Sequence, residues 1–311
     1  MRGITRCRLL QPQQTQVHKR LLRRRFTSSP GRAESFDFET AVNRRTDAES
    51  SVKWGRYGEG VLPMWIADMD FRAAPCVIDA LHERVQHGVF GYASPSAGLN
   101  TATIEYLQRR HGWQVDPAWI VWLPGLVPAL NMACQVAGEK GDSVLVPCPV
   151  YTPFLHAPRN NGRQLHPLPL LPPPAAGGSR QQQQGRAATT WELDWDAMDA
   201  AVSPESGEPR PCAFLLCNPH NPTGHCWPER TLQRLGEWCI RHDVLLCSDE
   251  VHADLVLDPT VRHVPVGSLS PEIGQASISL FAASKTCECG RVRYLVLSTV
   301  ACGLLVHTML C

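Results

Sequence analysis

Four short segments of the sequence carry side chains that could perform chemistry, and each lies at the end of an apolar run. They are "PGLVPAL" (124–130), "CNPHNPTG" (217–224), "SDEVH" (248–252) and "SKT" (284–286). Each segment alone is weak evidence, because Asn-Pro-Thr-Gly is commonly only a turn and an acid after a strand is commonly a helix cap. Their shared position is more informative, since open α/β sheets bind ligands at the carboxyl ends of their strands.

Together with the tyrosine that follows the run 143–150, these segments supply five kinds of group. The groups are an amine, a carboxylate, an amide donor, a flat ring and a glycine turn, supplied by Lys285, Asp249, Asn221, Tyr151 and Gly125. Pyridoxal 5'-phosphate requires all five: a lysine for covalent attachment, an acid at its pyridine nitrogen, a donor to its ring oxygen, a stacking ring and backbone amides for its phosphate. The set therefore predicts this cofactor and makes Lys285 the candidate catalytic amine.

The elements that must position these groups are predicted from hydrophobic periodicity. Strands covered on both faces are indicated by continuous apolar runs, at 143–150, 212–217, 244–248 and 277–283. Helices are predicted over 75–87, 98–111 and 228–243, and another after the Pro124-Gly125 turn. The alternation of strand, helix and strand predicts an α/β domain with a mostly parallel sheet.

The charge of the chain is distributed unevenly. The first 33 residues hold nine Arg or Lys and no acid, whereas the rest holds 21 basic and 29 acidic residues. An Arg-rich, acid-free start predicts a transit peptide over 1–33 and an organelle location, mitochondrion or plastid, with the cytoplasm as the alternative. A disordered basic arm that touches nucleic acid is the other interpretation, but the acidic remainder argues against nucleic acid as the main partner.

The 13 cysteines do not suggest disulfides, because they are scattered and several lie inside apolar runs. No secretory segment is visible, so reduced thiols are expected. Cys287 and Cys289 form a bare C-x-C without further ligands at zinc spacing, and no metal site is predicted.

Two segments are predicted to lie outside the core of the domain. Residues 171–190 are of low complexity and are expected to form a surface insertion. Residues 294–311 are apolar over about 18 residues, the lower limit for a membrane span. The interior His307 argues against a membrane anchor, so the interpretation preferred for 291–311 is an aberrant apolar tail.

The chain resembles the fold-type I pyridoxal-phosphate enzymes, aminotransferase class I and II, and within them the cystathionine β-lyase (MalY/PatB) branch. The resemblance rests on "LPMWIADMDF", "HGVFGY", "PGLVPAL", "CNPHNPTG", "SDEVHADLVL" and "SKT", which occur in that order between Phe36 and Thr286. It implies a cofactor-binding large domain over 73–290 and, before it, an N-terminal arm of the small domain over 34–72.

The resemblance also implies a role for each matching residue. Lys285 would hold the cofactor and remove the Cα proton, Asp249 would keep the pyridine nitrogen protonated, and Asn221 would donate to the ring oxygen. Tyr151 would stack on the ring. The other cofactor contacts implied are the amides of Gly125, Leu126 and Val127, the side chains of His252 and Ser284, and Tyr92 from the neighbouring subunit of a homodimer. The substrate side would be lined by Trp65, Ile66 and Ala67.

The implied reaction is α,β-elimination from cystathionine or a cysteine S-conjugate, which yields a thiol, pyruvate and ammonia. Transamination uses the same residues, so a pyridoxal-phosphate aminotransferase is the alternative. After Thr286 the family continues with an aromatic-Asn-Ile-Ala-Gly-Leu stretch, where this chain reads "CECGRVRYLVLS". The family's substrate-carboxylate arginine follows that point, so a C-terminally truncated, catalytically inert fragment is the third interpretation.

Overall fold

The computed structural model describes residues 37, 39–45, 51–92, 94–173 and 190–286, and the backbone of 294–298. The chain divides into two compact units, one of Met1–Asn43 with Asp70–Arg72 and one of Arg44–Met69 with Ala73–Cys311. In the described part of the first unit, the backbone N–H of Val42 donates to the carbonyl of Asp70 at 2.7 Å. The predicted transit peptide lies outside the described residues.

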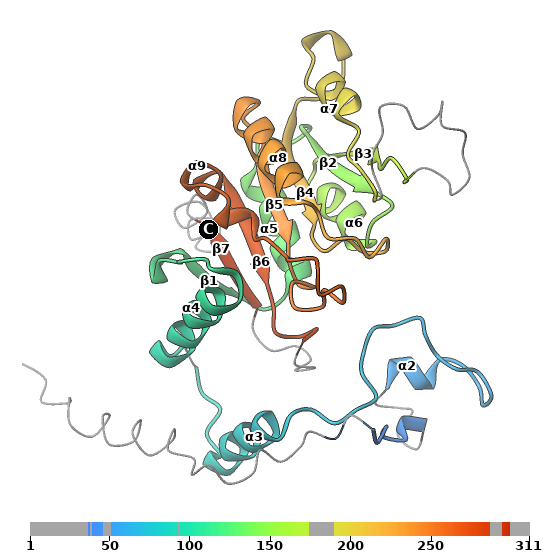
Figure 1. The fold of residues 1–311 in the computed structure, drawn as a ribbon, viewed down its shortest axis with the longest axis vertical. Helices are drawn as coiled ribbons and strands as arrows, with labels where there is room; N and C mark the ends of the chain where they lie inside the picture. Colours follow the sequence, from blue (N-terminus) through green and yellow to red (C-terminus); the bar gives the residue numbers. More distant parts are fainter. Residues whose placement is uncertain are drawn as a thin grey trace, which may run out of the picture. The chain divides into compact units, whose positions relative to one another are not determined.

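The second unit contains a 7-stranded sheet with the order β1-β7-β6-β5-β4-β2-β3 (Figure 1). The strands are β1 (Ile120–Leu123), β2 (Ser143–Cys148), β3 (Gln164–Pro169), β4 (Pro211–Cys217), β5 (Leu245–Asp249), β6 (Ser277–Phe281) and β7 (Tyr294–Ser298). All neighbours pair in parallel except β7, which is antiparallel to both β1 and β6. The predicted α/β class with a mostly parallel sheet is confirmed.

Helices cover both faces of this sheet. One face packs against α5 (Leu126–Val136) and α6 (Pro153–Asn160), and the other against α7 (Trp195–Ala201), α8 (Glu229–Arg241) and α9 (Pro271–Gln275). Side chains alternate between the faces along a strand. In β4, for example, Leu215 faces the first layer and Phe214 and Leu216 face the second. Burial on both faces is the reason that β2, β4 and β6 read as continuous apolar runs.

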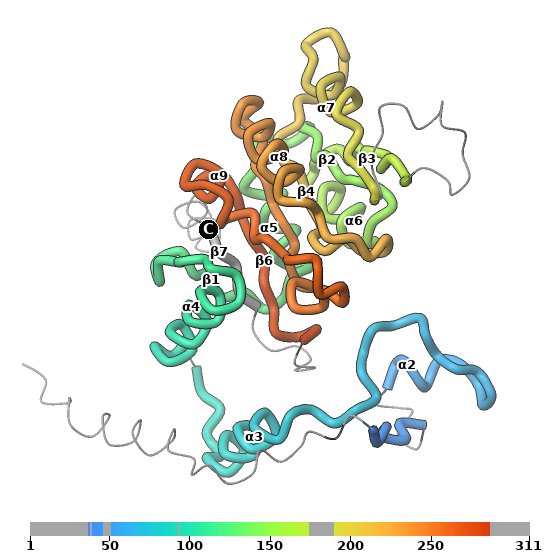
Figure 2. The backbone as a smooth tube through the Cα atoms, viewed as in Figure 1, coloured from blue at the N-terminus to red at the C-terminus, as the bar shows by residue number. Residues whose placement is uncertain are grey.

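The other described helices are α2 (Val52–Gly55), α3 (Pro75–His87) and α4 (Ala97–His111), with short 3₁₀ turns η2 (Pro117–Trp119), η3 (Pro204–Ser206) and η4 (Val266–Ser268). Figure 2 follows the chain through them. The predicted helix 75–87 coincides with α3, but its expected apolar stripe is exposed. Ile78, Leu81 and Val85 are 38%, 55% and 64% exposed. Helix α8 has the same length, and its stripe of Leu232, Leu235 and Cys239 is buried.

The sheet extends beyond the boundary expected at residue 290. Residues 294–298, assigned from sequence to an aberrant tail, form β7 between β1 and β6. The insertion at 171–190 begins and ends at an isolated bridge between Leu171 and Glu192, and 174–189 lie outside the described residues. So do Cys287, Cys289 and His307.

Three further expectations concern thiols, metals and membranes. The eight cysteines that the structure describes are free thiols. Within the described ranges no three His, Cys, Asp or Glu side chains are grouped so that they could hold a metal ion. None of the described helices combines the length and apolar character needed to cross a bilayer.

Candidate active site

The topology of the sheet brings the predicted site segments to one edge. Strands β2, β4, β5 and β6 are parallel, so their carboxyl ends share that edge. Strand β1 is antiparallel to β7, which is antiparallel to β6, so β1 also ends there. The residues that follow these ends are Gly125 after β1, Tyr151 after β2, Asn221 after β4, Asp249 at the end of β5 and Lys285 after β6.

Asp249 is the last residue of β5 and is only 5% exposed. Burial raises the pKa of its carboxyl group to about 7; the Val251 N–H, which donates to Oδ1 at 3.1 Å, opposes this shift. The charge of Glu250 raises the pKa further, and the amine of Lys285 lowers it. A buried carboxyl group in this state ionises readily when a cationic atom of a ligand lies beside it.

Lys285 lies in the turn 283–286 that follows β6, and its side chain is half-buried. Its Nζ atom donates to the carbonyl of Ala67 at 3.1 Å. This bond brings one of the predicted substrate residues to the candidate catalytic amine. The neighbours Trp65 and Ile66 expose 42% and 37% of their surface, and the Trp65 indole donates to the carbonyl of Lys53 at 3.4 Å.

The loops after β2 and β4 are joined directly. The backbone N–H of Tyr151 donates to the carbonyl of Asn221 at 3.1 Å, which brings the backbones of these two predicted site residues together. The Tyr151 side chain is 48% exposed, and its ring is therefore free to pack against a planar ligand.

His220 strengthens the same junction, although sequence analysis assigned it no role. Its ring is 2% exposed, with Nε2 2.8 Å from the carbonyl of Pro149 and Nδ1 3.3 Å from the carbonyl of Cys217. Burial lowers the pKa of this imidazole, against the effect of the two carbonyls. The ring therefore bridges the segments that follow β2 and β4. The signal in the sequence was a histidine inside "CNPHNPTG", directly after a buried strand.

The amino end of α5 provides backbone donors at the same edge. Gly125 is the N-cap residue, and no side chain caps the helix. Pro128 has no N–H, so the available amides are those of Gly125, Leu126 and Val127. Amides at a helix start attract anions, because the helix dipole is positive there.

The remaining predicted cofactor contacts, His252, Ser284 and Tyr92, differ in how far they are buried. His252 is half-buried, and burial lowers the pKa of its ring. A hydrogen bond with the Pro219 backbone raises this pKa, and the charge of Lys285 lowers it further. His252 therefore lies near both the β4 loop and the lysine. Ser284 is half-buried in the lysine turn. Tyr92 differs from both, because its side chain is fully exposed, at 112%.

A second acid, Glu250, is buried beside Asp249 and was also missed. It is 0% exposed, and its Oε1 accepts the Val266 N–H and the Ser279 hydroxyl, both at 3.0 Å. Its Oε2 accepts Nε2 of His263 at 2.7 Å. Glu250 directly follows the last residue of β5, and its partners come from β6 and from the segment 263–266, so the two adjacent acids have different environments.

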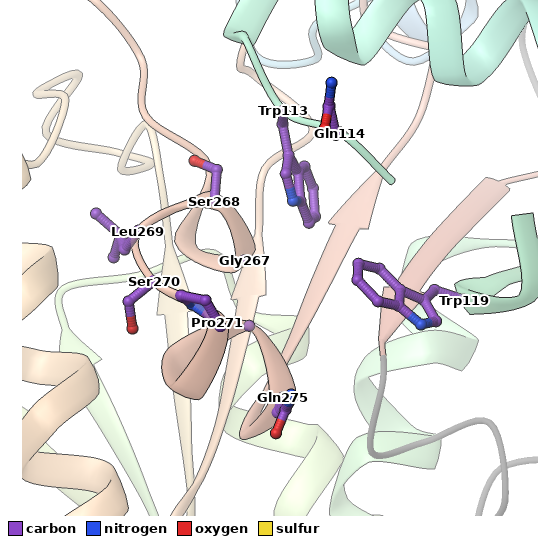
Figure 3. Close-up of a pocket in the computed structure, with 10 residues that line it drawn as sticks. Trp113, Gln114, Trp119, Gly267, Ser268, Leu269, Ser270, Pro271 and Gln275 are labelled. Carbon is purple, nitrogen blue, oxygen red and sulfur yellow. The ribbon is translucent and has the colours of Figure 1, made fainter. Parts of the chain in front are cut away.

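A cavity of about 300 Å³ lies elsewhere in the fold (Figure 3). The indole rings of Trp113 and Trp119 lie opposite the segment 267–275, and none of the lining residues belongs to the predicted site. Gly267 is required there, because a Cβ atom would lie 2.5 Å from the ring of Trp113. This cavity is therefore separate from the chemistry at the strand ends.

Comparisons with known proteins agree with this geometry. The family described as aminotransferase class I and II matches residues 60–287. Cystathionine β-lyase PatB of Bacillus subtilis is 42% identical over 241 residues, which are 76% of this chain and 57% of PatB.

Solved structures give the same result. OvoB is 38% identical with a TM-score of 0.74, covering 86% of this chain and 66% of its own. The pyridoxal-phosphate-bound C–S lyase of Staphylococcus hominis is 26% identical with a TM-score of 0.74, covering 89% of this chain and 66% of its own. The chain thus spans a little over half the length of the curated relative it matches.

Proposed function

Because the chain belongs to the aminotransferase class I and II family, we propose that it acts as a pyridoxal-phosphate-dependent carbon–sulfur β-lyase. The substrate class is cystathionine or cysteine S-conjugates, and the products are a thiol, pyruvate and ammonia. The observation that carries the proposal is the convergence of Lys285 and the buried Asp249 at one sheet edge. The likeness to a cystathionine β-lyase, at 42% identity, supports the choice of reaction.

The residues at this edge fit the cofactor. A protonated pyridine nitrogen would meet the Asp249 carboxyl group, whose pKa is raised to about 7 by burial. The phosphate would meet the amides that begin α5, and the exposed ring of Tyr151 would stack on the pyridine. Asn221, joined to Tyr151 through the backbone, would donate to the ring oxygen. When bound, pyridoxal phosphate supplies a sink for the electrons released at the substrate Cα.

The chain's own groups then have distinct tasks. Asp249 would keep the ring nitrogen charged, which requires that the acid itself be ionised by that contact. Lys285 would hold the cofactor, and its free amine would take the proton from the substrate Cα. Loss of this proton would allow the Cβ–S bond to break, so that a thiolate would leave and the remaining aminoacrylate would hydrolyse to pyruvate and ammonia.

Transamination remains the second candidate, because it uses the same residues and differs in where the proton is returned. The aspartate aminotransferase of Geobacillus stearothermophilus is 26% identical over 74% of this chain, well below the identity to PatB. This difference favours the lyase.

Assembly and location are further parts of the proposal. A homodimer is supported by the fully exposed Tyr92 and by the exposed apolar stripe of α3. An organelle location is supported by the basic, acid-free residues 1–33.

The test is to express the chain with pyridoxal phosphate and record the visible absorption of the bound cofactor. Lys285→Ala should abolish the band, whereas Lys140→Ala, which removes an exposed lysine far along the chain, should keep it. Pyruvate release from cystathionine then separates the lyase from the aminotransferase. A folded protein without the band would overturn the proposal, and a band without pyruvate release or amino transfer would favour the inert fragment.

A further inference from the structure

Asp254 connects the turn that carries His252 to the turn that carries Lys285. It lies in the turn 251–254 after β5, and its Oδ2 atom accepts the hydroxyl of Thr286 at 3.1 Å. Thr286 directly follows Lys285 in the chain. The backbone that bears the candidate catalytic amine is therefore held by a side chain of the neighbouring loop.

The same carboxylate reaches helix α4. The phenol of Tyr106 donates to Oδ2 at 2.7 Å, and Nε of Arg110 lies 3.5 Å from Oδ1. The side chain of Arg110 is 56% exposed, so its ion pair is weakened by solvent, whereas the side chain of Asp254 is 15% exposed. The phenol bond is the closer of the two links, at 2.7 Å against 3.5 Å, and it does not depend on the exposed Arg110 side chain.

Apolar packing joins the same three segments. Leu107 of α4, Ala253 of the turn and Phe281 at the end of β6 belong to one buried cluster. Leu107 follows Tyr106, and Ala253 precedes Asp254, so each polar link has an apolar contact beside it. Apolar contacts hold the segments together without fixing direction. The hydroxyl bonds add direction, because their geometry is restricted.

We propose that Asp254 is a positioning residue for Lys285, with Thr286 as the link to the lysine turn and Tyr106 as the support from α4. The proposal rests on the proposed function, since it concerns the attachment of the cofactor. A lysine amine stands on a flexible four-carbon stem. Fixing the backbone at its base therefore restricts the positions that the amine can take, and a small misplacement of a reacting group is costly.

The experiment compares Thr286→Val, which keeps the shape and removes the hydroxyl, with Thr286→Ser, which keeps the hydroxyl. Thr286→Val should weaken the apparent affinity for pyridoxal phosphate about tenfold, the effect of one hydrogen bond to a charged group. Thr286→Ser should keep the apparent affinity for pyridoxal phosphate near that of the wild type. In the cofactor-free protein, amide hydrogen exchange of residues 283–286 should be faster in Thr286→Val. The matched control is Thr260→Val, since the Thr260 hydroxyl donates to Asp258 at 2.7 Å in an exposed turn.

Tyr106→Phe is the second variant, because it removes a single hydroxyl from α4 and does not alter the lysine turn. Like Thr286→Val, it should weaken the affinity for pyridoxal phosphate and speed amide hydrogen exchange of residues 283–286, but by a smaller factor. If wild-type protein binds cofactor at Lys285 and both variants match it, the positioning role is wrong while the proposed function stands. If wild-type protein does not bind, the proposed function fails, and faster exchange in Thr286→Val still tests the link itself.

Discussion

Asp249 ends β5 and Glu250 follows it directly, yet the two acids have opposite environments. Among the described residues, the Glu250 side chain accepts hydrogen bonds from three, His263, Val266 and Ser279. The Asp249 side chain accepts one within the same part of the chain, from the Val251 N–H, and burial raises its pKa to about 7. Burial alone therefore does not mark a functional acid.

A ligand gains more binding energy at Asp249 than at Glu250. The polar atoms of Glu250 already have partners inside the chain, so a ligand would have to displace them. The carboxyl group of Asp249 lacks a cation that compensates its burial fully, and a charged ligand atom would supply one. Strained or incompletely satisfied groups are expected at functional sites, where structure is built for binding rather than for stability alone.

The largest expected effect on stability comes from removing the carboxyl group of Glu250, the acid with more hydrogen-bond partners. Glu250→Ala leaves His263, Ser279 and the Val266 N–H without their acceptor, and we expect a loss of about 3–5 kcal/mol of unfolding free energy. Asp249→Asn carries no ionisable group, so the cofactor-free variant should be no less stable than the wild type near pH 5. Urea denaturation followed by circular dichroism measures both, and equal losses in the two variants would contradict the comparison.

The second effect is a dependence of stability on pH. The pKa of Asp249 is raised from its ordinary 3.8 to about 7, so the folded state binds more protons than the unfolded state between these values. Stability of the cofactor-free protein should therefore fall as pH rises from 4 towards 7, about the range between the two pKa values. Asp249→Asn lacks this group and should lose less stability between pH 5 and pH 8. Parallel pH profiles for the two proteins would exclude this role of Asp249.

The smallest expected effect on stability is the difference between alanine substitutions at two buried serines, Ser279 and Ser248. Ser279 donates to Glu250 at 3.0 Å and accepts the Gly267 N–H at 3.3 Å, so Ser279→Ala should cost about 1–3 kcal/mol. The hydroxyl of Ser248 is equally buried but has no hydrogen-bond partner within the described part of the chain. Ser248→Ala should therefore be neutral or slightly stabilising. Thermal unfolding of both variants decides, and a larger loss for Ser248→Ala would contradict the assignment.

Much of the fold could be predicted from the sequence, because the central strands β2, β4, β5 and β6 are buried and their sequences are mainly apolar. The helix at Pro75–His87 was predicted with the observed bounds, and that at 228–243 to within two residues at each end. Their environments could not be distinguished, because periodicity defines an apolar stripe without naming the surface that covers it. Strands β1, β3 and β7 were not predicted. Strand β1 has only four residues, β3 is partly exposed and has no continuous apolar run, and the run from residue 294 was assigned to a tail.

The parts of the candidate site that could be predicted are those for which the cofactor requires a particular residue type. Lys285, Asp249 and Asn221 follow buried strands, and the order of the segments was sufficient to bring them to one edge. His220 and Glu250 were not assigned, because their importance depends on partners in other segments. The same holds for Asp254, whose acceptor role appears only when α4 and two turns meet.

The central claim is that Lys285 is the amine that attaches pyridoxal phosphate. The most direct measurement is to incubate the full chain with the cofactor, reduce with borohydride, digest with trypsin and locate the added mass. The added mass is expected on the peptide 263–291, which ends at Arg291 and in which Lys285 is the single lysine, with a missed cleavage at that residue. Label on Lys53 or Lys140, or spread over all lysines, would contradict the claim.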